Sequence, residues 1–307
     1  MSNIKLSTTD DVVHKKVTTL LMGRPKIGKT SLALTLNLEQ DSNLLYIAAD
    51  PGHLVLRKRK FQIARPQDGR PVDMEFLEDV YKYTRQEAAK GNLKWSFIDG
   101  LDVIADAVLR DKMKTQRDGR KAYGEMAEFM QEWIFKMRDL PAVSTVMITH
   151  VDEREVGGEV EYVPMLPGQI LLKKIFGWFD EIGAYRFVKT GENKIERYIQ
   201  FSSEVDPAYM VGDRSGVLSP FELPDLQKIF DKIHNEGLIT EGNADEILIP
   251  RDPEDLKALQ ALAIAAKMSV QEVTALASEI SGGRSPKYLK DADYETLVNK
   301  MKEKVND

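Results

Sequence analysis

The sequence predicts an α/β fold with a central, mostly parallel sheet, followed by a small helical module. Short apolar segments that each end in a polar residue alternate with stretches of helical periodicity over most of the chain. Beyond residue 253 only helical periodicity is present. A chain of 307 residues has room for about two domains. We therefore expect a main domain over residues 12–236, a linker over residues 237–252 and the helical module over residues 253–307.

The composition is that of a folded protein with an ordinary core. Hydrophobic residues make up 42% and charged residues 30% of the chain. The net charge of −6 gives no overall basic field, so any contact with nucleic acid must use a local patch. Cysteine is absent, which excludes disulfides and thiolate metal sites. Residues 1–11 lack the apolar core of a signal peptide, and no segment has the length of a membrane span, so we expect a cytoplasmic location.

The most specific motif begins at Gly23 and ends at Thr30. It fits the P-loop pattern G-x-x-x-x-G-K-[ST], in which two glycines let backbone N–H groups surround a polyphosphate. Lys29 places a positive charge at the β- and γ-phosphates, and the Thr30 hydroxyl is a ligand for Mg²⁺. The expected nucleotide-binding residues are Gly23, Arg24, Pro25, Lys26, Ile27, Gly28, Lys29, Thr30 and Ser31.

The flanks of the motif support it. Residues 17–22 are apolar or β-branched and predict a buried strand, while residues 31–36 predict a helix. Strand, glycine loop and helix follow one another in the order that a phosphate-binding loop requires.

Acidic residues end the next two predicted strands. Asp50 follows residues 43–49, and Asp99 follows residues 93–98. Because ligands bind at the carboxyl ends of parallel strands, both side chains should face the nucleotide. Asp99 matches a Walker B carboxylate, which holds Mg²⁺ together with Thr30. Asp102 is either a second acid on the metal side or an acid at a helix amino terminus.

Residues 144–150 form a third buried strand, which ends at His150. The polar segment that follows, residues 151–168, contains paired glycines and two prolines and predicts a long functional loop without a regular element. Residues 115–123 are charged and also predict a loop. Helices are predicted over residues 73–90, 101–113, 124–140, 169–179 and 223–235, and a β-hairpin over residues 181–202.

A basic block lies between the second strand and the first long helix. Arg57, Lys58, Arg59 and Lys60 are consecutive. Such a run is most often a solvated face, and the alternative is a patch that contacts the phosphates of DNA or of a neighbouring subunit's nucleotide.

The P-loop, followed by strands that end at Asp50, Asp99 and His150, resembles the RecA-like ATPase core over about residues 12–235. Within that class the chain is similar to phage-encoded recombination ATPases of the Sak type, which anneal single-stranded DNA. The resemblance implies a RecA-like P-loop NTPase core that uses ATP and Mg²⁺, assembles into a ring or filament and works in the cytoplasm of a bacterial host. It also implies single-stranded DNA, and a phage single-strand binding or annealing protein, as partners.

The same resemblance suggests further catalytic residues beside Lys29 and Asp99. Asp50 stands where RecA-like proteins carry a catalytic glutamate, and His150 where RecA has a glutamine that senses the γ-phosphate. Arg214 is similar to the arginine finger that hexameric helicases supply to a neighbouring subunit, although Gly212 replaces the lysine of that segment.

A second function class remains open. The segment that would correspond to the DNA-binding loop of RecA carries five acidic residues between positions 152 and 161. Acidic side chains bind phosphates poorly. They favour the alternative of a nucleotide-gated adaptor or helicase-loader-like ATPase without DNA strand chemistry, and leave Lys173, Lys174 or the basic block for any contact with DNA.

Overall fold

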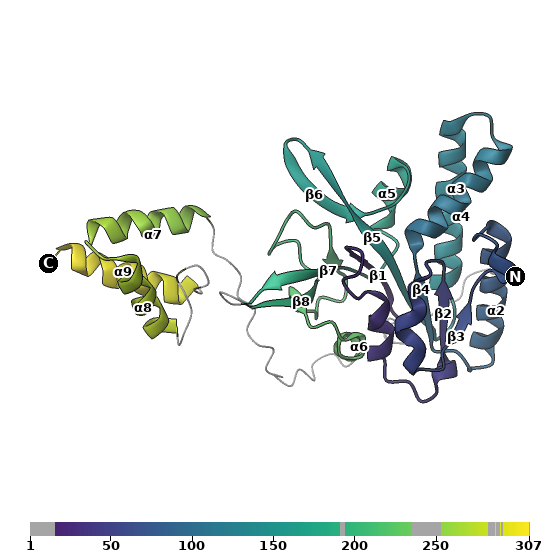
Figure 1. The fold of residues 1–307 in the computed structure, drawn as a ribbon, viewed down its shortest axis with the longest axis horizontal. Helices are drawn as coiled ribbons and strands as arrows, with labels where there is room; N and C mark the ends of the chain where they lie inside the picture. The colour runs from purple at the N-terminus through teal and green to yellow at the C-terminus, as the bar shows by residue number, and fades with distance from the viewer. Residues whose placement is uncertain are drawn as a thin grey trace, which may run out of the picture. The chain divides into compact units, whose positions relative to one another are not determined.

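A computed structural model describes residues 16–190, 194–234, 253–281 and 291–306, together with Pro286 and Leu289. The main body is a twisted sheet flanked by helices (Figure 1). Its strands lie in the order β10-β8-β7-β1-β5-β4-β2-β3. No helix among the described residues has both the length and the apolar character needed to cross a membrane.

The core of the sheet is parallel, and the first strand lies near its centre. β1 (Thr18–Gly23) pairs in parallel with β5 (Ser144–Val156) on one side and with β7 (Glu181–Lys189) on the other. β4 (Trp95–Asp99), β2 (Leu44–Ala48) and the short edge strand β3 (Gln62–Ala64) extend the parallel order. Beyond β7 the sheet continues with β8 (Ile195–Gln200) and ends with β10 (Phe221–Glu222), while the short strand β9 (Gly212–Asp213) pairs with β7. This arrangement confirms the predicted α/β class with a mostly parallel sheet.

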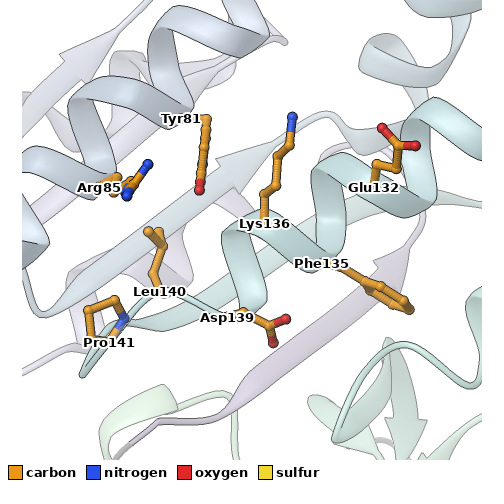
Figure 2. Close-up of a pocket in the computed structure, with 8 residues that line it drawn as sticks. All are labelled: Tyr81, Arg85, Glu132, Phe135, Lys136, Asp139, Leu140 and Pro141. Carbon is orange, nitrogen blue, oxygen red and sulfur yellow. The ribbon is translucent and has the colours of Figure 1, made fainter. Parts of the chain in front are cut away.

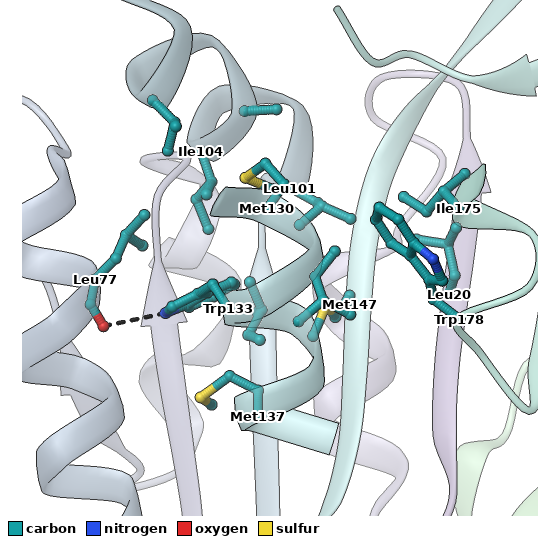
Figure 3. Packing of buried hydrophobic residues seen from close by; sticks show 14 of the residues in the cluster. Leu20, Leu77, Leu101, Ile104, Met130, Trp133, Met137, Met147, Ile175 and Trp178 are labelled. Atoms are coloured by element: carbon teal, nitrogen blue, oxygen red, sulfur yellow. Dashed lines mark hydrogen bonds between the residues drawn. The ribbon is translucent and has the colours of Figure 1, made fainter. Parts of the chain in front are cut away.

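Helices cover both faces of the sheet because successive residues of each buried strand point to opposite sides. One core cluster joins strand residues such as Leu20 and Met147 to α2 (Met74–Ala89), α3 (Leu101–Thr115), α4 (Gly119–Arg138) and α5 (Gln169–Ile175). Figure 3 shows this cluster, in which the Trp133 indole N–H donates to the Leu77 carbonyl oxygen at 3.1 Å. The other cluster joins Leu21 and Tyr46 to the helical turns η1 (Thr30–Thr35) and α6 (Leu226–His234).

Two predicted loops are wrong. Residues 151–168 were expected to lack a regular element, but β5 continues to Val156 and turns back as β6 (Glu159–Pro164). Gly157 and Gly158 have φ values of 64° and 91°, so the paired glycines make a tight hairpin turn. Figure 1 shows this β5–β6 hairpin projecting beyond the sheet. Between residues 115 and 123 only a short break separates α3 from α4, since Asp118 caps α4 by accepting from the Arg120 amide.

The helical module contains α7 (Pro253–Ala265), α8 (Val270–Ser281) and α9 (Asp291–Asn306). Their buried side chains form a cluster of their own, which includes Leu259, Val273, Leu297 and Met301. These helices belong to a second compact unit of the chain. The predicted linker, residues 237–252, lies outside the described residues, so the domain boundaries stay a prediction.

Candidate functional site

The P-loop leaves the sheet directly from the buried strand β1. A Cβ on Gly23, the last residue of that strand, would lie 2.8 Å from the Tyr185 carbonyl oxygen, so only glycine fits there. Lys26 and Gly28 have left-handed φ values of 62° and 108°, which turn the backbone around the loop. The predicted helix after the loop is a single 3-10 segment, η1, and the Ser31 amide donates to the Gly28 carbonyl at 3.0 Å.

Lys29 lies inside the loop and is only 7% exposed. Its Nζ donates to the carbonyl oxygens of Gly23 at 2.7 Å and Arg24 at 3.1 Å. Burial lowers the pKa of this ammonium, while the carboxylates of Asp99, Asp102 and Asp50 act in the opposite direction. The ammonium therefore lies within electrostatic reach of all three acids, at the place where a polyphosphate would contact it.

Asp99 is the centre of a hydrogen-bonded group at the carboxyl end of β4. The Thr30 hydroxyl donates to Asp99 Oδ2 at 2.7 Å, and the Tyr46 hydroxyl donates to the same oxygen. Asp99 is 5% exposed, and this burial raises the pKa of its carboxyl group although both hydrogen bonds counteract it. Burial, and then the Asp99 charge, raise the pKa of Tyr46, so its hydroxyl stays a donor. The P-loop threonine and the Walker B acid thus meet as the sequence predicted.

Asp50 reaches the same place from the end of β2. A Cβ built on Gly52 would lie 3.5 Å from Thr30 Oγ1, 3.9 Å from Asp99 Oδ2 and 4.0 Å from Asp50 Oδ1, so these three oxygens face one point. The Asp50 amide also donates to the Asp99 carbonyl oxygen at 3.1 Å, which ties the ends of β2 and β4 together.

These oxygens fit Mg²⁺. Hydroxyl and carboxylate oxygens are the ligands that this ion prefers, and it commonly takes one or two from the protein and the rest from phosphates and water. Thr30 and Asp99 provide such a pair. Among the described residues no group of three or more His, Cys, Asp or Glu side chains is placed to hold a metal ion by itself.

His150 lies on β5, between β1 and β4, at the last position where β5 pairs with β1 and opposite Gly23. Its Nδ1 is 2.7 Å from Asp102 Oδ2, and Asp102 lies in the first turn of α3 with 7% exposure. The other oxygen, Asp102 Oδ1, is buried without a hydrogen-bond partner. Asp102 is therefore a helix amino-terminal acid, as one of the two sequence alternatives held, and it also orients a histidine beside the P-loop.

Arg197 and Tyr185 are two further residues at the loop that the sequence analysis missed. Arg197 Nη1 donates to the Ile27 carbonyl oxygen at 3.1 Å. A Cβ on Gly28 would lie 2.9 Å from this nitrogen and 3.6 Å from the Tyr185 hydroxyl oxygen. Both residues come from strands that follow the P-loop by more than a hundred positions, so no local pattern connects them to it. The only sequence signal is an arginine within an otherwise regular strand.

Arg214 lies away from the P-loop of its own chain. Its amide donates to the Asp180 carbonyl at 3.1 Å, and its Nη1 is 3.5 Å from Asp180 Oδ1. The Thr18 amide donates to Asp180 Oδ2 at 2.9 Å, so Arg214 and Asp180 lie at the amino end of β1. The P-loop begins at the opposite, carboxyl end of the same strand. The side chain is 57% exposed, and the structure does not bring it to the other site residues.

The basic block is divided by its contacts. Arg59 Nε donates to Asp41 Oδ1 at 2.6 Å, and its guanidinium lies 5.2 Å from the Phe61 ring centre. Arg57, Lys58 and Lys60 are exposed. Since Asp41 directly precedes β2 and also accepts from the Lys60 amide, the block lies at the amino end of the strands. Lys173 and Lys174 are exposed in the last turn of α5.

One cavity lies between α2 and α4, apart from the P-loop (Figure 2). It has a volume of about 510 Å³ and is lined by Tyr81, Arg85, Glu132, Phe135, Lys136, Asp139, Leu140 and Pro141. Lys136 bonds to Glu78 at 2.8 Å and lies over the Tyr81 ring. None of the predicted site residues lines this cavity, so the nucleotide site is defined by the loop and the strand ends.

A comparison with protein families agrees with this geometry. The family model described as AAA domain matches residues 15–210, which include β1, the P-loop, Asp99 and His150. No curated protein matches the chain. Because the match covers well over half of the sequence, the chain belongs to the AAA domain family of P-loop ATPases.

Proposed function

We propose that this protein binds ATP with Mg²⁺ and hydrolyses it. The observation that supports the proposal best is the hydrogen bond from Thr30, which follows Lys29 in the P-loop, to Asp99 at the end of β4. Phosphoryl transfer from a nucleotide needs a phosphate clamp beside a metal-side carboxylate.

Each residue of the site has a separate role in binding or hydrolysing the nucleotide. The backbone amides of the loop bind phosphate oxygens, and Lys29 exchanges its carbonyl partners for the β- and γ-phosphates. Thr30 and Asp99 would hold Mg²⁺, and the ion would supply positive charge against the charge that develops on the phosphates. Asp50 lies beside Asp99 and His150 is held by Asp102, so either side chain is a candidate to orient the attacking water.

Binding and turnover test this proposal. Isothermal titration with ATP and Mg²⁺, followed by phosphate release, should show both activities in the unaltered protein. Lys29→Ala should lose binding by at least about a hundredfold, because the loop loses its buried charge on the phosphates. Lys82→Ala, which removes an exposed lysine of α2, serves as the control. Full activity in Lys29→Ala would overturn the assignment of the site.

The finer proposal is a RecA-like ATPase of phage recombination that self-assembles and binds single-stranded DNA. Exposed cations at Arg57, Lys58 and Lys60 support it, as do Lys173 and Lys174. Clustered cations are the electrostatic requirement for tracking a phosphate backbone.

The acidic β5–β6 hairpin supports the second candidate, a nucleotide-gated adaptor. Asp152, Glu153, Glu155 and Glu159 are exposed on it, and this hairpin starts directly after His150. Such a surface repels DNA and suits a basic protein partner. The ATPase rate with and without single-stranded DNA separates the two candidates: stimulation supports recombination, and an unchanged rate with no DNA binding supports the adaptor.

A further inference from the structure

The carbonyl oxygen of Ile27, inside the P-loop motif, accepts a hydrogen bond from a distant strand. Its donor is Nη1 of Arg197 on β8, at 3.1 Å. Guanidinium groups stay charged at all accessible pH values, so this is a charge-assisted bond to a backbone carbonyl. No salt bridge involving Arg197 occurs among the described residues, and the loop carbonyl is therefore a principal partner of its charge.

The geometry of one peptide unit gives this bond a consequence. The described residues contain no cis peptide bond, so the Ile27 C=O and the Gly28 N–H point in opposite directions from the same plane. Arg197 holds the C=O on the side of β7 and β8. The Gly28 N–H consequently points away from Arg197.

Tyr185 lies beside this guanidinium. It is 4% exposed on β7, pairs in register with Gly23 and places its hydroxyl near the same point of Gly28 as Arg197. Burial raises the pKa of Tyr185 although the adjacent Arg197 counteracts it, so the phenol stays neutral beside the cation. Glycine at position 28 is required for its φ of 108°, and a Cβ there would lie 2.9 Å from Arg197 Nη1 and displace the guanidinium.

We infer that Arg197 is a positioning residue for nucleotide binding, which orients and polarises the Ile27–Gly28 peptide so that the Gly28 N–H donates to a phosphate. A donor on the carbonyl strengthens the N–H of the same peptide unit, because hydrogen bonds in a chain polarise one another. This inference rests on the proposed function and adds to it a residue of the same site that acts through the backbone.

The inference predicts a split between binding and chemistry. The Gly28 N–H contacts phosphate in the ground state and the transition state alike, so losing its orientation weakens both equally. KM and the Kd for ADP should rise while kcat stays nearly constant. Loss of a catalytic arginine would lower kcat and leave the Kd for ADP unchanged. General loosening of the fold would lower the melting temperature and affect kcat as well as binding.

The experiment compares Arg197→Met with Arg197→Lys and with Arg120→Met, which removes an exposed arginine of α4 far along the chain from the loop. Titration calorimetry with Mg-ADP and Mg-ATP should give about tenfold weaker binding for Arg197→Met, the size expected for one charge-assisted hydrogen bond. Arg197→Lys, which keeps a charged donor, should recover part of the loss, and Arg120→Met should bind like the unaltered protein. Arg197→Gln repeats the test with a polar side chain if Arg197→Met does not fold.

The outcomes separate this inference from the proposed function. If the unaltered protein binds no nucleotide, the proposed function fails first. If it binds nucleotide and both Arg197→Met and Arg197→Gln bind equally well, the positioning role is wrong while the proposed function stands. A large fall in kcat with unchanged ADP affinity would instead place Arg197 at the reacting phosphate and also overturn the inference.

Discussion

His150 Nδ1 lies 2.7 Å from Asp102 Oδ2, which joins the end of a sheet strand to the first turn of α3. The strand also pairs with β1 through the register of His150 with Gly23. This hydrogen bond thus links β5, which pairs with the P-loop strand β1, to α3.

This link predicts a defect in turnover rather than in binding for His150→Ala. The imidazole reaches the site from a neighbouring strand and leaves the phosphate-binding loop intact, so ATP affinity should change less than about threefold. Hydrolysis should fall by at least about tenfold, in the range of a positioned proton-transfer or orienting group. Asp102→Asn should give a smaller loss because the amide keeps the hydrogen bond. Normal hydrolysis in His150→Ala would remove this residue from the mechanism.

Asp99→Asn should bind ATP but hydrolyse it only at higher Mg²⁺ concentrations. The substitution keeps the shape of the side chain and removes the negative charge that accepts from Thr30 and would attract the metal ion. Titrating Mg²⁺ at fixed ATP should require at least about tenfold more metal for half-maximal activity. Tyr46→Phe is the companion variant, since it removes only the second donor to Asp99 and should shift the metal requirement less. Equal metal curves for all three proteins would contradict the role of Asp99.

Arg214→Ala tests action across a subunit boundary. The side chain is exposed and distant from its own P-loop, so any nucleotide it contacts must be bound by a neighbouring subunit. Arginine fingers supplied in trans are worth about a thousandfold or more in rate. Arg214→Ala should bind ATP normally and hydrolyse it poorly, and mixing it with Lys29→Ala protein should restore part of the activity. Absence of recovery at concentrations that support assembly would show that Arg214 has no trans role.

The exposed part of the basic block is tested by the triple variant Arg57→Ala, Lys58→Ala and Lys60→Ala. If these cations contact single-stranded DNA, the slope of log affinity against log salt should fall by about 2, because each phosphate contact contributes about 0.7. Arg59 is left in place since it holds Asp41 and Phe61. Fluorescence anisotropy at several salt concentrations measures the slope, and an unchanged slope assigns the block to solvation.

Glu181→Gln should remove a pH dependence of stability. Burial, followed by the neighbouring Asp213, raises the pKa of Glu181 from 4.5 to about 9. Between these values the folded state binds one proton more than the unfolded state, so the free energy of unfolding falls as pH rises, by about 1.4 kcal/mol per pH unit. Urea denaturation should therefore find Glu181→Gln close to the unaltered protein near pH 5 and more stable by about 3 kcal/mol near pH 7. Exposed Glu153→Gln is the control, and parallel pH curves for Glu181→Gln and the unaltered protein would refute the shift.

Much of the site could be predicted because its residues lie at the ends of recognisable strands. Gly23, Asp50, Asp99 and His150 each follow an apolar segment, and parallel strands bring such ends to one edge. Their order across the sheet did not follow from the sequence, since β5 lies between the strands that carry Gly23 and Asp99.

The parts that escaped prediction depend on contacts between distant segments. Arg197 reaches Ile27 only after β7 and β8 have joined the sheet, and no local pattern reports that contact. The β5–β6 hairpin was mistaken for a loop because its strands are charged on exposed positions, and polar composition masks strand periodicity where neither face is fully buried. The Gly157-Gly158 pair was the available signal for its turn.

The position of β1 has a consequence for how the protein is made. Its partners are β5 and β7, and the bond from the Thr18 amide to Asp180 closes a separation of 162 residues. At ribosomal rates of 5–20 residues per second, this apolar strand waits about ten to thirty seconds for its second neighbour. Nascent chains that end before β5 contain every residue of the P-loop motif yet lack both strands that pair with β1. The P-loop is thus synthesised early, and the sheet can position it only after β5 and β7 have been made.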